Sequence, residues 1–274
     1  MRQTEGSMLC PRCRKLISVS APACPYCGVV RPGMFGYGPA VSRLLRDMDP
    51  VRAIPIVCIA LYVIALAIDP RAIFRGTASL FGILSPSSRA LFLLGSTQSA
   101  DLHLGRWWTL LSAVYLHGSI LHILFNVMWI RNLAPEVQNA FGPARFFVIW
   151  TFAGAAGFLA SNLVPSPGSV GASGAIFGLM AALIVYGRVI GASLLTRQIW
   201  QWAILLGVMG FVLPGVDNLA HIGGFAGGWI AASLYRRRLG QPTGPGTALL
   251  ALLLTVLTAA SFCLSVVTGL QLLR

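Results

Sequence analysis

The sequence predicts an all-α polytopic membrane protein, and composition and hydropathy are the main reasons. Of its 274 residues, 56% are hydrophobic and only 10% are charged, and the mean hydropathy is +0.77. A soluble globular domain carries about 25% charged residues, so this chain has too few polar side chains to cover a surface in water. The apolar residues also gather in long runs, as membrane-spanning helices require. Composition therefore excludes a cytosolic enzyme, a disordered chain and a small secreted disulfide protein.

Seven apolar stretches are predicted to cross the bilayer, because a spanning helix needs roughly 17–25 residues. The segment 74–94 also contains apolar patches, but Pro86, Ser87, Ser88 and Arg89 interrupt them. We interpret it as part of a long loop, 69–109, and whether that loop is embedded stays open. The predicted spans are 53–68, 110–130, 146–164, 173–189, 199–213, 219–235 and 247–272.

The chain is expected to divide into four parts. A cysteine-rich module at 1–35 is followed by a polar linker at 36–52. Residues 53–240 then hold six spans, and 241–274 add a seventh. The predicted fold is thus a six-helix bundle with a C-terminal seventh transmembrane helix.

Membrane topology explains most of the net charge of +13. Of the 20 Lys and Arg residues, 15 lie in the N-terminal tail or in the loops after the second, fourth and sixth spans. Positively charged loops remain in the cytoplasm, so the N-terminus is predicted inside and the C-terminus outside, as in a bacterial inner membrane. No basic patch lies outside this pattern, and nucleic acid is therefore not an expected partner.

Four cysteines in the N-terminal tail have the spacing of a metal site. Cys10 and Cys13 form one CxxC pair, and Cys24 and Cys27 form a second pair ten residues later. Four thiolates complete the tetrahedral shell of structural zinc. Two disulfides are the alternative, although a reducing cytoplasm disfavours them. We predict one structural zinc ion, no catalytic cofactor, and a protein partner for this zinc-ribbon-like module.

Polar side chains inside three predicted spans are candidates for a functional site, because such groups are costly in a membrane. The second span holds His122 and Asn126, which share one helix face at i and i+4. The fourth span opens on Ser173, and the sixth carries His221 near its start. Taken singly, each Ser or His is explained more simply by packing within or between helices. The fourth and sixth spans are both predicted to start at the outer side, however, so Ser173 and His221 are expected at similar depth in the membrane.

Glycines around these two residues predict that their helices approach closely. Gly174 and Gly178 have GxxxG spacing, as do Gly224 and Gly228. A Ser–His hydrogen bond of about 2.6–3.2 Å requires such an approach. Neither span contains Asp or Glu, so a dyad is more plausible than a triad. His122, Asn126 and the backbone N–H of Ser173 would then donate to an oxyanion, while helix packing alone also explains Gly171 and Gly174.

The motifs Gly-Ala-Ser173-Gly-Ala-Ile-Phe-Gly, His122-Ile-Leu-Phe-Asn126 and Ala-His221-Ile-Gly-Gly-Phe-Ala-Gly-Gly228 resemble the signature blocks of the rhomboid intramembrane serine proteases. The resemblance covers about 53–235. It implies a bilayer-embedded endopeptidase that cleaves single-pass transmembrane proteins near the outer membrane face.

The resemblance also implies residue roles. Ser173 would be the nucleophile and His221 the general base, with His122, Asn126 and the Ser173 amide as the oxyanion hole. Phe177 would pack on the ring of His221, and His117 would be more structural than catalytic.

The sequence departs from the family pattern at one place. The family often has Trp-Arg where this chain has Arg106-Trp107-Trp108-Thr109, which affects loop stability rather than the catalytic assignment. A catalytically inactive relative that binds membrane clients is the main alternative, but such relatives lose the Ser or the His. A small transporter or channel would need ionisable groups along a pathway, and the three polar spans lack Asp and Glu.

Overall fold

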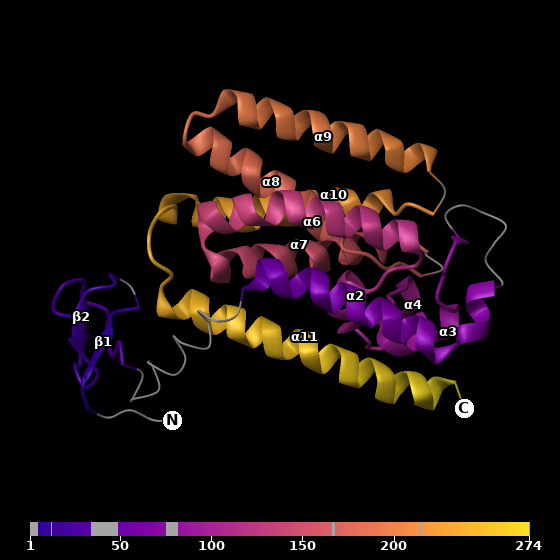
Figure 1. Cartoon of the computed structure of the whole chain (residues 1–274), viewed down its shortest axis with the longest axis horizontal. Coiled ribbons are helices and arrows are strands. Elements are labelled where there is room, and N and C mark those ends of the chain that lie inside the picture. The colour runs from indigo at the N-terminus through magenta and orange to yellow at the C-terminus, as the bar shows by residue number, and fades with distance from the viewer. Residues whose placement is uncertain are drawn as a thin grey trace.

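The structure is a computed structural model of the chain, and it describes residues 5–11, 13–33, 49–74, 82–165, 168–213 and 215–273. A small hairpin lies at the N-terminal end, and a bundle of helices follows (Figure 1). The hairpin pairs β1 (Ser7–Leu9) with β2 (Leu16–Ser18) in antiparallel register, with Leu9 opposite Leu16. Most of the expected linker lies outside the described residues.

Seven long helices form the bundle, and shorter helical segments join them. The long ones are α2 (Pro50–Ile68), α6 (Ile120–Phe141), α7 (Pro143–Ser161), α8 (Ser173–Val189), α9 (Ser193–Val212), α10 (Asn218–Tyr235) and α11 (Pro245–Leu272). The short ones are η2 (Pro70–Phe74), α3 (Ser88–Leu94), α4 (Ser99–His103), α5 (Thr109–Ser112), η4 (Ala113–Tyr115) and η5 (Arg236–Arg238).

The prediction of an all-α membrane bundle is confirmed, but the bounds of the second predicted span are wrong. Instead of one helix over 110–130, the segment Thr109–Tyr115 meets α6 at 91°. Ser119 caps α6, since its side chain accepts a hydrogen bond from the His122 N–H. The helix then continues to Phe141, so Arg131 belongs to α6 and not to a loop.

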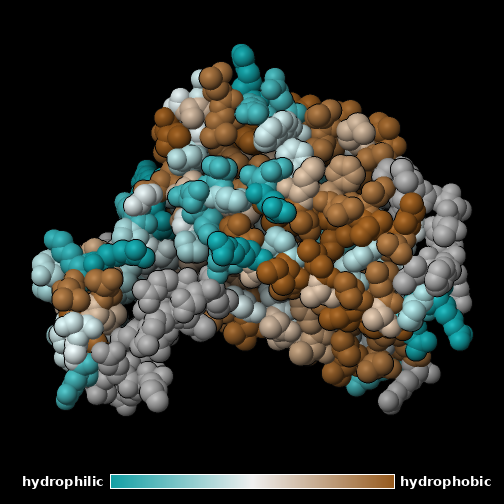
Figure 2. All heavy atoms as spheres, viewed as in Figure 1, coloured by the Kyte–Doolittle hydropathy of each residue, from teal (hydrophilic) through white to brown (hydrophobic). Residues whose placement is uncertain are grey.

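Few of the described helices meet a strict length and hydropathy criterion for crossing a membrane by themselves. Three do, namely α2, α7 and α11, and a fourth is reached if the bent pair before Phe141 counts as one span. The helix α8 is apolar but has only 17 residues. Figure 2 shows hydrophobic residues over much of the bundle, with hydrophilic residues gathered in its left-hand part.

The bundle is built around α8 and α10. The most extensive helix contacts are those of α10 with α7 and α8, and nearly every residue of α8 is buried. Two helices lie on opposite sides of this centre (Figure 1): α9 packs on α8, whereas α11 packs on α3, α5 and α7. The central position of α8 and α10 means that the residues at their facing surfaces are shielded by other helices.

Glycines allow the backbones of α8 and α10 to touch. A methyl group on Gly224 would overlap the carbonyl oxygen of Gly174, and one on Gly228 would overlap the backbone of Gly178. On the neighbouring helix α7, a methyl group on Gly157 would come within 2.6 Å of the Ala220 carbonyl oxygen. Close packing through small residues is a general way for membrane helices to associate. These contacts bring the first turns of α8 and α10 together.

Arg145 binds the loop that connects α10 to α11. Its guanidinium donates hydrogen bonds to the carbonyl oxygens of Arg238 (2.9 Å), Gln241 (2.9 Å) and Pro242 (2.9 Å), all in the loop after α10. It also donates to the Phe141 carbonyl oxygen at 3.1 Å. Because Arg145 is buried, these carbonyls replace the water that its charge would otherwise require.

The glycine contacts predict a specific loss of stability. Gly228→Ala should lower the free energy of unfolding by about 1–3 kcal/mol, because the methyl group has no space between α8 and α10. Gly207→Ala is the matched control in α9, where nothing lies within 4 Å of an added methyl group. That control should be neutral or stabilising by about 0.5–1 kcal/mol. Equilibrium unfolding in mixed micelles measures both, and equal effects would contradict the packing role of Gly228.

Candidate active site

The first turns of α8 and α10 bring a serine and a histidine into hydrogen-bond contact. Ser173 begins α8, and His221 lies in the first turn of α10. The Ser173 Oγ and His221 Nε2 atoms are 2.9 Å apart. Phe177, one turn after Ser173, stacks on the imidazole, with ring centroids 4.3 Å apart and an angle of 16° between the planes. The aromatic ring therefore fixes the orientation of the imidazole that faces Ser173.

The second nitrogen of this imidazole has no polar partner. The Nδ1 atom of His221 is buried and makes no hydrogen bond within the described part of the chain. The pair is thus a Ser–His contact without a carboxylate bonded to the histidine, in contrast to a Ser–His–Asp triad.

His122 lies beside Gly171, two residues before α8 begins. Its Nδ1 accepts a hydrogen bond from the Gly118 N–H at 3.4 Å, so its Nε2 carries the proton when the ring is neutral. A methyl group on Gly171 would come within 2.7 Å of that Nε2, and Gly171 has φ +135. Both the backbone conformation and the neighbouring imidazole therefore require glycine at 171.

Asn126 is one turn further along α6 and is partly engaged with its own helix. Its Nδ2 donates to the His122 carbonyl oxygen at 2.8 Å, which leaves one amide proton for another acceptor. His117 stacks edge-to-face on His122, with ring centroids 5.1 Å apart, and is almost fully buried. The structure thus puts His122 against Gly171, near the start of α8, with His117 edge-to-face on His122 and Asn126 one turn further along α6.

Sequence reasoning assigned no role to Asp217, which the structure puts at the start of α10. One carboxylate oxygen of Asp217 caps the helix by accepting the Ala220 N–H at 2.9 Å. The other oxygen accepts a hydrogen bond from the hydroxyl of Ser161, the last residue of α7. The signal in the sequence was an Asp three residues before a helical N–H, which is a standard N-cap pattern. Asp217 therefore fixes the turn that carries His221.

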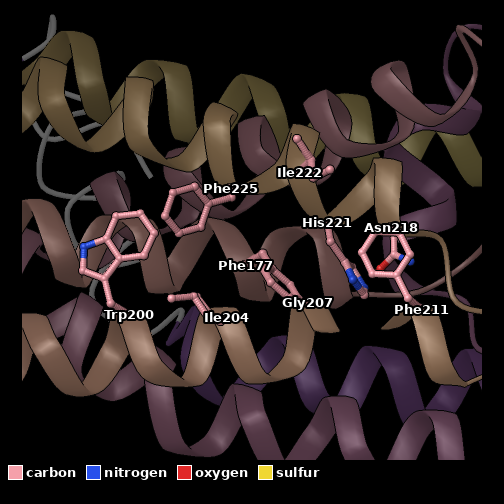
Figure 3. A pocket seen from close by; sticks show the side chains of 10 residues that line it. Phe177, Trp200, Ile204, Gly207, Phe211, Asn218, His221, Ile222 and Phe225 are labelled. Carbon is pink, nitrogen blue, oxygen red and sulfur yellow. The ribbon is translucent and has the colours of Figure 1, made fainter. Parts of the chain in front are cut away.

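A cavity opens beside His221, between α9 on one side and α8 and α10 on the other. It has a volume of about 210 Å³, and its walls are almost entirely apolar. Figure 3 shows Trp200 at one end of this cavity, Phe225 and Ile204 along it, and His221 with Phe211 at the other end. An apolar hollow of this kind next to a Ser–His pair can hold hydrocarbon rather than a polar group.

The segment that departs from the family pattern forms a buried polar network. Arg106 Nη1 is 2.7 Å from Asp101 Oδ1, and both side chains are buried. Burial of Asp101 raises the pKa of its carboxyl, although the Arg106 guanidinium opposes that shift. Thr109 Oγ1 and Asn162 Nδ2 both donate to Thr97 Oγ1, at 3.1 and 2.7 Å. The network therefore ties the segment 97–109 to the end of α7.

The same segment also reaches the start of α8. Thr97 and Ser169 exchange backbone hydrogen bonds of 3.1 and 2.7 Å. The Gly171 N–H then donates to the Ala113 carbonyl oxygen at 2.9 Å. The chain just before Ser173 is thus held at Ser169 and at Gly171 by backbone hydrogen bonds to Thr97 and Ala113.

The four cysteines of the N-terminal module form a cluster with metal-site dimensions. All four sulfur atoms lie within 4.8 Å of one another, and none forms a disulfide. The Sγ atoms of Cys10 and Cys27 are 3.7 Å apart, and those of Cys13 and Cys24 are 3.6 Å apart. Four sulfurs at about 2.3 Å from one tetrahedral ion would be about 3.8 Å from each other. The cluster can therefore hold a metal ion.

The backbone around the second pair favours thiolate at Cys24. Burial by itself would raise the pKa of this thiol, but hydrogen bonds from the backbone of Tyr26 and Cys27 outweigh burial and lower it to about 6. Thiolate is the form that binds metals.

The cap on α10 gives a testable expectation. Asp217→Ala should lower the free energy of unfolding by about 1–2 kcal/mol, because it removes the acceptor of the Ala220 N–H. Asp217→Asn should retain most of the stability, since its amide oxygen can cap the same N–H. Unfolding in mixed micelles measures the difference, and an Asp217→Asn variant as unstable as Asp217→Ala would show that the cap is not what matters.

Comparison with known proteins finds relatives in one family. The sequence model of the Rhomboid domain matches residues 104–238. The chain is 34% identical to the rhomboid protease GluP of Bacillus subtilis over 184 residues, which cover 65% of this chain and 35% of that protein. It is 32% identical to RHOMBOID-like protein 4 of Arabidopsis thaliana over 175 residues, or 60% of this chain and 44% of that protein.

A shorter relative is covered more completely. The "Putative rhomboid protease YdcA" of Bacillus subtilis is 32% identical over 139 residues, which are 47% of this chain and 68% of that protein. The chain spans less than half the length of GluP and of RHOMBOID-like protein 4, so the activity of those whole proteins is not carried over by these matches. The matched region includes Ser173 and His221, and the chain belongs to the rhomboid family.

Proposed function

We propose that this chain is an intramembrane serine endopeptidase that uses Ser173 and His221 as a catalytic dyad. The observation that carries the proposal is the 2.9 Å contact between Ser173 Oγ and His221 Nε2. Nucleophilic serine chemistry requires a base within such reach. Membership of a family with named proteases supports the same conclusion.

The reaction follows from the positions of the polar atoms. His221 Nε2 takes the proton of Ser173 Oγ as that oxygen attacks a peptide carbonyl carbon, which gives a tetrahedral intermediate. The same nitrogen then gives its proton to the leaving amine, and an acyl ester remains on Ser173. Water, deprotonated by His221, attacks the ester carbonyl, releases the new carboxyl terminus and restores the serine hydroxyl.

Three donors are suited to hold the negative oxygen of the intermediate. The backbone N–H of Ser173 has no partner in its own helix, because it lies in the first turn of α8. The Nε2–H of His122 and the second amide proton of Asn126 come from α6 on the other side. Preorganised donors of this kind are typically worth a factor of about 10²–10³ each.

The substrate would be a single-pass transmembrane protein cut near one face of the bilayer. Ser173 lies at the beginning of α8, so the dyad is near the end of the bundle and not at its middle. The distribution of Lys and Arg supports an orientation with that end outside and the N-terminus in the cytoplasm. We propose the bacterial inner membrane as the location.

We also propose that the cysteine cluster holds one zinc ion with a structural role. Sulfur distances of 3.6–3.7 Å and an all-thiolate donor set are suited to tetrahedral zinc. With four protein ligands, such a site leaves no open position for chemistry. The module would then serve to contact a protein partner.

Active-site labelling tests the dyad. A fluorophosphonate probe should label the wild-type protein in detergent and should not label Ser173→Ala. His221→Ala should lose both labelling and cleavage of a transmembrane substrate, and combining the two substitutions should cause no further loss, since the pair acts as one unit. Asn126→Ala should retain measurable activity, because two other donors remain.

Two results would overturn this mechanism. One is a folded His221→Ala variant that cleaves at the wild-type rate. The other is a folded Ser173→Ala variant that still cleaves the substrate. Neither the protease proposal nor the inactive client-binding alternative allows this variant to cleave.

Metal analysis tests the zinc proposal. The wild-type chain, purified under reducing conditions, should contain about one zinc per chain. Cys24→Ser should lose it, whereas Cys58→Ser, in the buried part of α2, should retain it. Zinc retained in full by Cys24→Ser would contradict a four-cysteine site.

A further inference from the structure

One face of α9 lines two cavities, one beside charged residues and one beside His221, and we call these two cavities together the furrow. The first cavity, at the start of α9, has a volume of about 360 Å³. The second is the 210 Å³ cavity beside His221. Trp200 lines both, and the α9 residues in the two walls recur with the 3–4 residue spacing of one helix face. They are Ser193, Thr196, Arg197, Trp200, Ala203, Ile204, Gly207 and Phe211.

The charged end of the furrow has two arginines and no acidic residue in its wall. Arg188, from the last turn of α8, and Arg197, from the second turn of α9, both line the 360 Å³ cavity. The ion pairs within the described residues are Arg52–Asp49 and Arg106–Asp101, so neither furrow arginine is neutralised by a carboxylate there. Ser193, in the same wall, adds a hydroxyl. Two guanidinium groups and a hydroxyl in the wall of one cavity suit a phosphate group.

Aromatic rings connect this charged end to the apolar end. The guanidinium of Arg188 lies 4.9 Å from the ring centroid of Trp229. Trp229 packs on Trp200 and Phe225, with centroids 6.4 and 6.0 Å away. Trp200 and Phe225 also line the cavity at His221. The furrow thus changes from cationic to apolar within two helical turns.

We propose that this furrow binds an anionic phospholipid, with its phosphate between Arg188 and Arg197 and one acyl chain along α9 toward His221. Ten residues separate Arg197 from Gly207, or about 15 Å along a helix. That length equals one leaflet, which is half of the hydrocarbon core of about 30 Å. A chain anchored at the arginines therefore ends in the cavity beside His221.

The surroundings of the furrow favour a membrane lipid over other anions. The connections α8–α9 and α10–α11 lie at the same end of the bundle (Figure 1), and the second carries Arg236, Arg237 and Arg238. Anionic lipids concentrate at such basic juxtamembrane surfaces. The apolar end matches an acyl chain and offers nothing to a free phosphate ion.

Lipid retention by the full-length protein in neutral detergent tests the proposal without any assay of cleavage. Native mass spectrometry should show one phosphatidylglycerol bound per chain, and much less phosphatidylcholine. The double variant Arg188→Gln/Arg197→Gln should bind phosphatidylglycerol about 30-fold more weakly. Arg236→Gln/Arg237→Gln is the matched control, with the same charge change at exposed arginines at that end, and should weaken binding much less than the substitutions at Arg188 and Arg197 do.

Two further measurements separate the headgroup from the acyl chain. Inorganic phosphate should not displace the lipid at concentrations where a second phospholipid does. Ile204→Trp, which fills the apolar half of the furrow, should weaken binding although both arginines remain. Arg188→Lys/Arg197→Lys keeps the charge and should retain most of the affinity.

The proposal is overturned if the two arginine pairs lose lipid equally, since the effect would then be one of general surface charge. It is also overturned if phosphatidylcholine binds as tightly as phosphatidylglycerol, or if phosphate alone displaces the lipid. Unchanged binding by Ile204→Trp would exclude the acyl-chain position beside His221. Because all of these readouts concern lipid, they stay independent of whether Ser173 is catalytic.

Discussion

The contact on which the site depends is the one between the glycine backbones of α8 and α10. Gly174 and Gly178 face Gly224 and Gly228 so closely that added methyl groups would overlap neighbouring main-chain atoms. A hydrogen bond of 2.9 Å between Ser173 and His221 needs this separation, because neither side chain is long. The chemistry of the site is thus set by residues that have no side chains, in a part of the bundle where packing supplies most of the helix association.

Orientation of His221 comes from aromatic packing and from a helix cap, and not from a carboxylate hydrogen-bonded to the imidazole. Phe177 stacks on the imidazole, and Asp217 holds the first turn of α10 through Ala220 and Ser161. In a triad, an acidic residue bonded to the imidazole does this work. Here an aromatic ring and the capped beginning of a helix fix the same degree of freedom.

Much of the fold was predictable because hydropathy and glycine spacing act locally. The bounds of α8, 173–189, were predicted to the residue, and the cysteine cluster followed from its CxxC spacing. The bend before α6 was missed because Leu110 to Ile130 is apolar enough on average to read as one span, whereas the break depends on Ser119 capping a backbone N–H. Neither Asp217 nor the cavity lined by Trp200 could be found by hydropathy, since each depends on a partner from a helix distant in sequence.

The seventh helix, α11, packs on the six-helix core and is covalently linked to it. Arg145 binds the loop that leads into α11, and α11 packs on α3 and α5, which lie in the segment between α2 and α6. A separate membrane protein could cover the same surface only at a sufficient density in the bilayer. Covalent linkage replaces that density with an effective concentration set by a short connection, which for flexible linkers is of millimolar order. The support that α11 gives to α3 and α5 is therefore independent of the concentration of any other protein in the membrane.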